Sequence, residues 1–322
     1  MKIATRPLLT IAALLVTHAA WSQSVYPAKP VRVILGFPPA SAADLVARIV
    51  GAKMSDGLSQ QLVIDNRPGA SSNIATEAVV RAPADGYTLL MGTIANTINA
   101  SLYAKLAFDF ARDLTPIAAV ASVPNLLVVH PSLPVRSVAE LIKAAQTKPG
   151  EILYGSSGNG TGPHLSGELF NLMAHVKLVH IPYKGSPQAM TDLLGGRVMV
   201  MFSPASTALP HIKAGTLRAL ASSGAQRTAS APELPTIAEA GLPGFETTVW
   251  FGLLAPVNTP REIVERLSKE VARALNDADV KRQFATQGID AISGTPEQFA
   301  TYIRDETAKW ARVVQASGAK ID

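Results

Sequence analysis

The segment 155–162, which reads Gly-Ser-Ser-Gly-Asn-Gly-Thr-Gly, carries the most informative chemical pattern in the chain. It follows an apolar run and precedes a helical pattern, so backbone N–H groups and a helix N-terminus should converge there, as in anion sites. It departs from a phosphate-binding loop because no Gly-Lys-Ser/Thr follows. Pro163 and Asn159 occupy positions where dinucleotide loops and hydrolase elbows need glycine. We therefore predict a ligand-binding loop, against the alternative of an ordinary glycine-rich turn.

Two further loops stand between an apolar run and a helical pattern. In 36–44 the prolines stiffen the turn, and Ser41 is placed to cap the following helix. Asp44 either completes that cap or contacts a ligand, and both interpretations stay open. In 66–73, Arg67 either attracts an anion or holds the loop by bonding carbonyls. The two loops in 36–44 and 155–162 are predicted to present two helix N-termini to one anion from opposite sides.

Catalytic sets of residues are sparse. Ser157 with His164 or His180 would supply a nucleophile and a base, but no pattern fixes their geometry and no acid is placed to orient the imidazole. His164 and Glu168 would share one helix face, yet two ligands do not make a zinc site and no His-Glu-x-x-His pattern occurs. We therefore expect a protein that is not an enzyme and that has no metal and no cofactor.

Apolar runs and helical patterns alternate along most of the chain. The runs are nearly continuous in apolar residues, which is typical of parallel strands covered on both faces. The alternation predicts an α/β fold with doubly wound sheets. The predicted strands are 31–36, 61–65, 87–92, 126–130, 152–155, 178–182, 198–202 and 217–221. The predicted helices include 42–58, 74–81, 138–146, 163–173 and 188–194.

From Thr259 onward the pattern indicates three successive helices. Thr259 and Thr295 each precede a proline and then a residue that can bond back to the cap, which marks helix starts. A helical run after two βα blocks indicates that the chain returns to the first lobe, with crossings near 123–125 and in 247–255. The last helix carries a one-sided stripe that favours core packing. Its members are Phe299, Tyr302, Ile303, Trp310, Val313 and Val314.

Length and composition narrow the class further. A chain of 322 residues suffices for two lobes, and the lack of cysteine excludes disulfides and thiolate chemistry. The formal net charge of +5 would suit a nucleic-acid partner. However, the Lys and Arg residues are scattered along the chain and form no basic run, so we expect no nucleic-acid partner. Lys2, Arg6, an apolar stretch and the small residues around Trp21 predict a cleavable signal peptide over 1–22 and a periplasmic mature protein.

Ordered motifs across the mature chain resemble one known family. They include Phe37-Pro-Pro with Asp44, Val63-Ile-Asp-Asn-Arg-Pro-Gly-Ala, Ala84-Asp-Gly-Tyr-Thr-Leu-Leu, Pro182-Tyr-Lys-Gly, Asp192-Leu-Leu-Gly-Gly and Pro243-Gly-Phe-Glu. With the glycine-rich segment, these motifs resemble the extracytoplasmic solute receptors of tripartite tricarboxylate transporters, which are also called TctC-like or Bug proteins.

The resemblance implies a type II periplasmic binding fold, in which two α/β lobes joined by two crossing strands close around a ligand in the interlobe cleft. Lobe 1 is expected to comprise 23–124 and 250–322, and lobe 2 to comprise 125–249. The implied ligand is a small carboxylated solute held by loop backbone groups and hydroxyls. The ligand-binding residues predicted on this basis are Phe37, Ala40, Ser41, Asp44, Ser71, Thr93, Ser156, Ser157, Gly160, Thr161, Tyr183 and Ser203.

Two departures from the family pattern bear on the ligand. Ala40 and Ser41 stand where relatives usually have two glycines, which predicts a smaller and more polar pocket edge. Ser203 stands where many relatives have an aspartate, which favours a ligand without an amine or a more anionic one. The expected partners are a small organic acid and the membrane subunits of a transporter, with the protein itself a monomer. The alternatives are a sensor that feeds a kinase and a periplasmic serine hydrolase.

Overall fold

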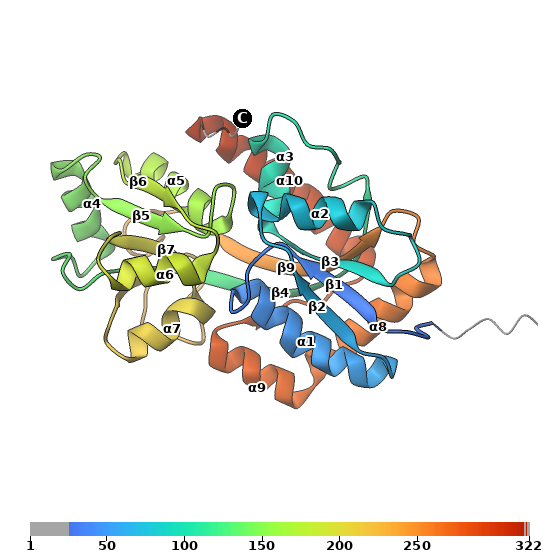
Figure 1. The fold of residues 1–322 in the computed structure, drawn as a ribbon. Coiled ribbons are helices and arrows are strands. Elements are labelled where there is room, and N and C mark those ends of the chain that lie inside the picture. The colour runs from blue at the N-terminus through green and yellow to red at the C-terminus, as the bar shows by residue number, and fades with distance from the viewer. Residues whose placement is uncertain (1–25, 319, 321–322) are drawn as a thin grey trace, which may run out of the picture.

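The chain forms two α/β lobes that lie side by side and are joined by two long strands (Figure 1). The computed structural model describes residues 26–318 and residue 320, so the signal peptide predicted at 1–22 lies outside the described residues. The arrangement confirms the predicted α/β class with two lobes and two crossing strands.

Lobe 1 is built on three parallel strands. Strand β1 (Val31–Leu35) lies between β2 (Leu62–Asn66) and β3 (Thr88–Thr93). Every residue of the inner strand β3 is buried, whereas the edge strand β2 is only partly covered, which matches their apolar and mixed sequences. The helices that follow these strands are α1 (Ala42–Leu58), α2 (Asn73–Val80) and α3 (Ile94–Leu102), with a single 3-10 turn at Ala70–Ser72.

Lobe 2 repeats this design with its own parallel strands. Strand β5 (Leu153–Ser156) pairs in parallel with β6 (Val179–Pro182) on one side and with β7 (Val200–Pro204) on the other. The remaining elements of this lobe are β8 (Arg218–Ser222), α4 (Val138–Thr147), α5 (Gly162–Ala174), α6 (Ser186–Leu194) and α7 (Ala205–Lys213).

Two antiparallel strands carry the chain between the lobes. Strand β4 (Leu114–Val129) pairs with β9 (Thr248–Pro256) as far as Pro124, and from Asn125 it pairs with β7 and β8 of lobe 2. The change of partners therefore falls inside 123–125, where the sequence predicts a crossing. The lobe boundaries given above stay a prediction.

A buried polar network lies at the crossing. Asn125 Nδ2 donates to Ser166 Oγ at 3.2 Å, and Ser166 Oγ lies 2.7 Å from Thr247 Oγ1. The Asn125 N–H donates to Ser223 Oγ at 3.0 Å, and all four residues are 0% exposed. Because Ser166 belongs to α5, the network fastens that helix to both crossing points with hydrogen bonds between neutral groups.

The carboxy-terminal segment returns to lobe 1 as predicted, with α8 (Arg261–Asn276), α9 (Ala278–Gln287) and α10 (Pro296–Ser317). Helix α8 packs on α1, and α10 packs on α3. A short strand β10 (Asp290–Ala291), which the sequence did not indicate, pairs with β4. The stripe of α10 is confirmed as a packing face for Phe299, Ile303, Trp310 and Val314, which are buried, while Tyr302 lies at its rim.

The helix starts were predicted with mixed success. Thr295 caps α10 with a reciprocal box to Gln298, and α1 has the predicted bounds with Ser41 as its N-cap. The prediction for Thr259 is wrong, because its hydroxyl donates to the Pro256 carbonyl at 2.7 Å and Pro260 precedes the first turn of α8. Helices α3 and α7 were not predicted. Helix α7 contains Pro210, and α3 is rich in Asn, Thr and Ile, which are weak helix formers.

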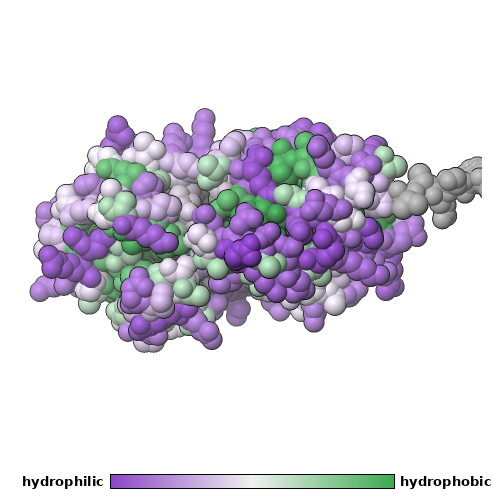
Figure 2. All heavy atoms as spheres, turned by 90° about the horizontal axis from the view of Figure 1, so that it is seen from below, coloured by the Kyte–Doolittle hydropathy of each residue, from purple (hydrophilic) through white to green (hydrophobic). Residues whose placement is uncertain are grey.

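Hydrophilic residues predominate on the face drawn in Figure 2, where hydrophobic residues form separate patches. Among the described residues, no helix combines the length and the apolar character that crossing a membrane requires.

Candidate functional site

Five helices begin at the edges where the two lobes face each other. The loops that follow the carboxyl ends of parallel strands gather at one edge of a sheet, and in both lobes this edge adjoins the cleft. The first residues of α1 and α3 from lobe 1 and of α5 and α6 from lobe 2, together with Pro204 immediately before α7, surround one small space of about 30 Å³, here termed the inner cavity. Its lining residues are Phe37, Ser41, Ala42, Ala43, Thr93, Ile94, Ala95, Ser157, Thr161, Gly162, Pro163, Ser186, Pro204, Val249 and Phe251.

The wall from lobe 1 is formed by two capped helix starts. Ser41 Oγ accepts the Asp44 N–H at 3.3 Å at the start of α1. Thr93 Oγ1 accepts the Ala95 N–H at 3.2 Å, and Asn96 completes the reciprocal box at the start of α3. In each case the remaining N–H groups of the first turn have no carbonyl partner within their helix. These N–H groups are the donors that lobe 1 brings to the inner cavity.

Asp44 stabilises the loop before α1 rather than lining the inner cavity. Its carboxylate accepts the Ala40 N–H at 3.0 Å, the Arg48 Nε–H at 3.0 Å and the Asn66 amide at 3.0 Å. Burial raises the pKa of Asp44, but these hydrogen bonds outweigh it and hold the pKa below its ordinary value. The carboxylate accepts the N–H of Ala40 and not that of the cap residue Ser41, so it does not form the reciprocal box, and contact of Asp44 with a ligand stays a prediction.

The wall from lobe 2 is formed by the glycine-rich segment and the starts of α6 and α7. The Thr161 hydroxyl donates to the Gly158 carbonyl at 2.7 Å, so its hydrogen is used inside the loop. The hydroxyls of Ser157 and Ser186 form no hydrogen bond with another described residue. They are therefore available to a ligand, together with the N–H groups of the first turns.

The inner cavity is electrically positive without a charged side chain. Among the described residues, none that lines it is ionisable. Each helix N-terminus carries about half a positive charge, and anions are favoured there. The rest of the wall is apolar and includes Phe37, Ile94, Val249 and Phe251. The arrangement suits a small anion that has an apolar part.

A second and wider space, the outer cavity, adjoins the inner one. It has a volume of about 560 Å³, and the two share Phe37 and Ser157 in their linings. Its wall also includes Ser71 and Tyr103 from lobe 1 and Tyr183 and Lys184 from lobe 2. A ligand held in the inner cavity could therefore extend past Phe37 and Ser157 into the outer one.

The lobes touch each other around these cavities. The Ser71 hydroxyl donates to the Asn159 carbonyl across the cleft. Gly185 packs against Pro38, and a methyl group added to the Gly185 Cα would lie 2.5 Å from Pro38 Cγ. Gly160, with φ of +73°, lies so close to α3 that a methyl group would overlap Asn99 and come within 2.8 Å of Leu102. Glycine is required at both positions because the lobes approach closely there.

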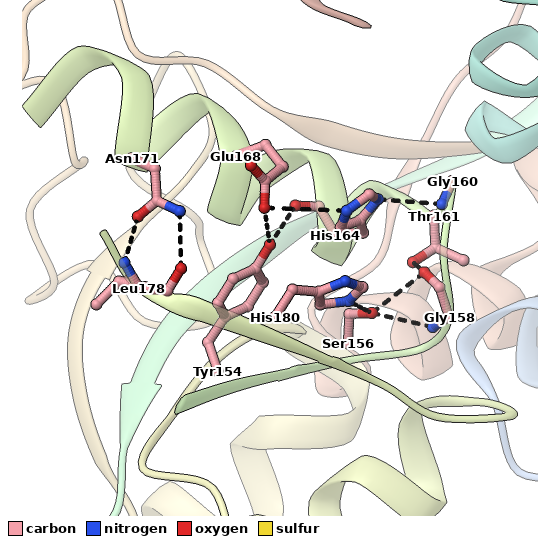
Figure 3. A network of polar contacts seen from close by, with 10 residues as sticks. All are labelled: Tyr154, Ser156, Gly158, Gly160, Thr161, His164, Glu168, Asn171, Leu178 and His180. Atoms are coloured by element: carbon pink, nitrogen blue, oxygen red, sulfur yellow. Dashed lines mark hydrogen bonds and ion pairs between the residues drawn. The ribbon is translucent and has the colours of Figure 1, made fainter. Parts of the chain in front are cut away.

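A network of side chains supports the glycine-rich segment from behind (Figure 3). Ser156 Oγ lies 2.6 Å from His180 Nε2 and accepts the Gly158 N–H at 3.1 Å. The Gly160 N–H donates to His164 Nδ1 at 3.1 Å, which makes that nitrogen the unprotonated one. The two imidazole rings stack with centroids 4.1 Å apart. The loop is thus fixed by neutral hydrogen bonds to two stacked rings.

Tyr154 closes the network at its other end. Its ring stacks on His180 with centroids 5.0 Å apart, and its hydroxyl donates to Glu168 Oε1 at 2.6 Å. Burial lowers the pKa of His164 to about 4, and burial with the neighbouring His164 lowers the pKa of His180 to about 3. Both imidazoles are therefore neutral at pH 7, and the approach of His164 Nε2 to Glu168 at 3.9 Å is not an ion pair.

The structure also reassigns the serine and histidine that the sequence offered as a catalytic pair. Ser156, not Ser157, bonds to His180, and Ser156 is 0% exposed. Ser157 lies at the cavity wall without a histidine partner among the described residues. The described residues also contain no group of three or more metal-ligating side chains.

The predicted site residues divide into three sets. Phe37, Ser41, Thr93, Ser157 and Thr161 line the inner cavity, and Ser71 and Tyr183 line the outer one. Five others line neither cavity: Ala40, Asp44, Ser156, Gly160 and Ser203. They support the wall from behind, as Ser156 and Asp44 do, or pack between lobes, as Gly160 does. Contact of any of these residues with a ligand stays a prediction.

Sequence reasoning missed two of the helices that begin at the inner cavity, α3 and α7, although Thr93 before α3 was among the predicted site residues. Helix α6 was predicted to start at 188, two residues after its first residue Ser186. A signal was present for Ser186, because it follows a predicted strand and Gly185 in the same pattern as the other loops. Val249 and Phe251 come from β9, and nothing in their local sequence indicates that this strand forms the floor of a cavity.

The chain is similar to one family of known proteins and to several solved structures. The family described as "Tripartite tricarboxylate transporter family receptor" matches residues 46–319. The protein BugT of Bordetella pertussis is 37% identical over 302 residues, which cover 93% of each chain. Two solved structures of Rhodopseudomonas palustris proteins are similar throughout. One, solved with adipate, is 40% identical and has a TM-score of 0.89. The match covers 92% of this chain and 100% of that chain. The other, MatC with bound malate, is 30% identical and has a TM-score of 0.85. The match covers 90% of this chain and 100% of that chain.

Substituting Gly160 tests whether the closed arrangement is required for binding. In Gly160→Ala the methyl group would overlap Asn99 and Leu102 of the opposite lobe, so we expect affinity for a bound acid to fall roughly tenfold or more, about 1.4 kcal/mol. The control is Gly215→Ala, which has nearly the same φ of +70° but no atom within 4 Å of the added methyl group. Calorimetric titration of both variants measures the effect. Equal affinities for the two would contradict this role of Gly160.

The buried imidazoles predict a loss of stability in mild acid. Their folded pKa values of about 4 and 3 lie below the unfolded value of 6.5, so the unfolded chain binds more protons between pH 6.5 and 4. The contribution of the two neutral imidazoles to the free energy of unfolding is complete above pH 6.5. It decreases as the pH falls, by up to about 1.4 kcal/mol per pH unit for each histidine. Urea unfolding at pH 6.5 and pH 5 measures it. His180→Asn should flatten the dependence of stability on pH; equal slopes for wild type and His180→Asn would refute the assignment.

Proposed function

The chain belongs to the tripartite tricarboxylate transporter receptor family, and we propose that it captures a small organic acid in the inner cavity, with the carboxylate against the helix N-termini. The family and its solved neighbours are solute-binding receptors and not enzymes. The observation that carries the proposal is the convergence of five helix starts on one uncharged cavity. No other described cavity combines these features.

Neutral donors can hold a carboxylate more economically than a buried cation. An arginine or lysine in a closed cavity would lose its hydration, at several kcal/mol per ion, before it met the ligand. Backbone N–H groups of a first helical turn are already oriented and lack partners within their helix. The ligands of the two solved neighbours, adipate and malate, are both carboxylates, which supports extending this class to the present chain.

Location and partners follow from the same proposal. The signal peptide predicted at 1–22 would deliver the protein to the periplasm, where it would work as a monomer. It would then pass its ligand to the membrane subunits of a transporter of the tripartite tricarboxylate type. The family description supports a receptor for such a transporter. A protein that instead feeds a sensor kinase would bind the same acid, so the two uses share one site.

Removing hydroxyls should weaken binding selectively. Ser157→Ala and Ser186→Ala each remove a donor without a partner among the described residues, and each should cost about 1 kcal/mol, or roughly fivefold in affinity. Thr161→Ala should cost less at the ligand, because its hydrogen goes to Gly158. The control is Arg67→Ala, since Arg67 pairs with Asp65 at 2.9 Å and lines neither cavity. Calorimetry with an acid found by thermal-shift screening decides; loss of binding in Arg67→Ala with silent serine variants would contradict the proposal.

Ligand binding should also change the overall dimensions. The structure has the lobes in contact at Ser71–Asn159 and Gly185–Pro38, which corresponds to a closed state. We propose that lobe 1 (23–124 and 250–322) and lobe 2 (125–249) separate by a hinge motion at β4 and β9 when the cavity is empty. Small-angle scattering should give a smaller radius of gyration at saturating acid than without it. A radius that is the same in both conditions would count against hinge closure.

A further inference from the structure

The backbone between β2 and α2 is left-handed over several residues. Ala70, Ser71 and Ser72 have φ of +44°, +51° and +77°, and Gly69 before them has φ of +143°. In the left-handed region the Cβ atom of an L-residue lies too close to the following carbonyl oxygen, so residues other than glycine occupy it singly and at a cost. Here three such residues follow one another. Segment 69–72, here termed the left-handed turn, is therefore strained.

We propose that the left-handed turn opposes closure of the lobes. It is held in its strained form while the lobes are closed and relaxes when they separate, which favours release of the bound acid. The inference rests on the proposed function, because it requires the hinge motion given above. It adds to that function a device that sets the balance between the open and the closed state.

One restraint on the left-handed turn comes from the opposite lobe. The Ser71 hydroxyl donates to the carbonyl of Asn159 in the glycine-rich segment, so this hydrogen bond exists only while the lobes are in contact. Within lobe 1 the turn is closed by a hydrogen bond from the Ser72 N–H to the Gly69 carbonyl at 3.1 Å. Separation of the lobes therefore removes a restraint on the middle of the turn.

A second restraint, the side chain of Asn99 in α3, also depends on the closed arrangement. Its Nδ2 donates to the Ser71 carbonyl and to Asn73 Oδ1, both at 2.8 Å. Its Oδ1 is buried without a hydrogen-bond partner among the described residues, and a methyl group added to Gly160 of lobe 2 would lie 2.4 Å from it. A buried carbonyl oxygen without a partner is unfavourable. Opening would let water reach this oxygen, so the side chain that supports the turn is itself stabilised when the lobes separate.

The exchange of one alanine for glycine tests the strain. Ala70 is exposed, so Ala70→Gly removes the steric cost of the left-handed region and little packing. Because the strain is present in the closed state and relieved in the open one, the variant should bind adipate or malate, the acids in the two solved neighbours, roughly fivefold more tightly than wild type. Calorimetric titration measures the affinities. An affinity equal to or below that of wild type overturns the inference.

A matched control separates this effect from the general effect of glycine. Ser59, at the end of α1, is exposed, has φ of +53° and lines neither cavity. Ser59→Ala and Ser59→Gly differ by the same methyl group as wild type and Ala70→Gly, and they should bind the acid equally well. A gain for Ser59→Gly over Ser59→Ala as large as the gain for Ala70→Gly also overturns the inference.

The distance between the lobes gives a readout that requires no acid. Because the chain has no cysteine, Arg81→Cys in lobe 1 and Lys143→Cys in lobe 2 place one spin label at an exposed site of each lobe. If wild type binds neither acid, the proposed function is contradicted for these acids, and the distances between the labels in the acid-free protein decide the inference. A larger closed fraction in Ala70→Gly than in wild type supports it, and identical distance distributions overturn it.

Discussion

The structure depends on the unsatisfied N–H groups at the starts of five helices. The first turn of every helix leaves several such groups without a partner, and exposing them to a closed apolar cavity would be costly unless a ligand or water accepts them. The parallel strands of both lobes end at the cleft, so the topology brings α1, α3, α5, α6 and α7 to the same place. The same feature that makes the empty cavity unfavourable makes a bound anion favourable.

Holding those N–H groups in position requires support that contributes no charge of its own. On the side of lobe 2, Ser156, His164 and His180 fix the glycine-rich segment, and burial keeps both imidazoles neutral. At the crossing strands Asn125 and Ser166 tie α5 to β4, again through neutral groups. Charged support close to the cavity would add its own field to that of the helices. Two carboxylates are exceptions: Asp44 is paired with Arg48, and Glu168 accepts the Tyr154 hydroxyl.

The features that could be predicted from the sequence are those that depend on residues close together in the chain. The bounds of α1, the caps at Ser41 and Thr295, and the place of the glycine-rich segment between a strand and a helix follow from residues within a few positions of each other. The sequence could not distinguish Ser156 from Ser157, because their roles depend on His180, which a neighbouring strand places beneath the loop. Likewise α3 reaches the cavity through tertiary packing despite weak helix formers, and Val249 reaches it through a strand crossing that no local pattern reports.

A receptor that must release its ligand gains from neutral recognition. Removing a carboxylate from a buried cation would leave an unpaired ion in a low-dielectric cavity, and that cost would oppose opening. When the carboxylate leaves helix N-termini, the donors left behind are dipoles that water can solvate as the lobes separate. The contacts that close the cleft are equally modest, since one hydroxyl of Ser71 and the close approaches at Gly160 and Gly185 contribute shape rather than charge. Tight capture in the closed state is therefore compatible with release on opening, because both rest on geometry that the proposed hinge motion would undo.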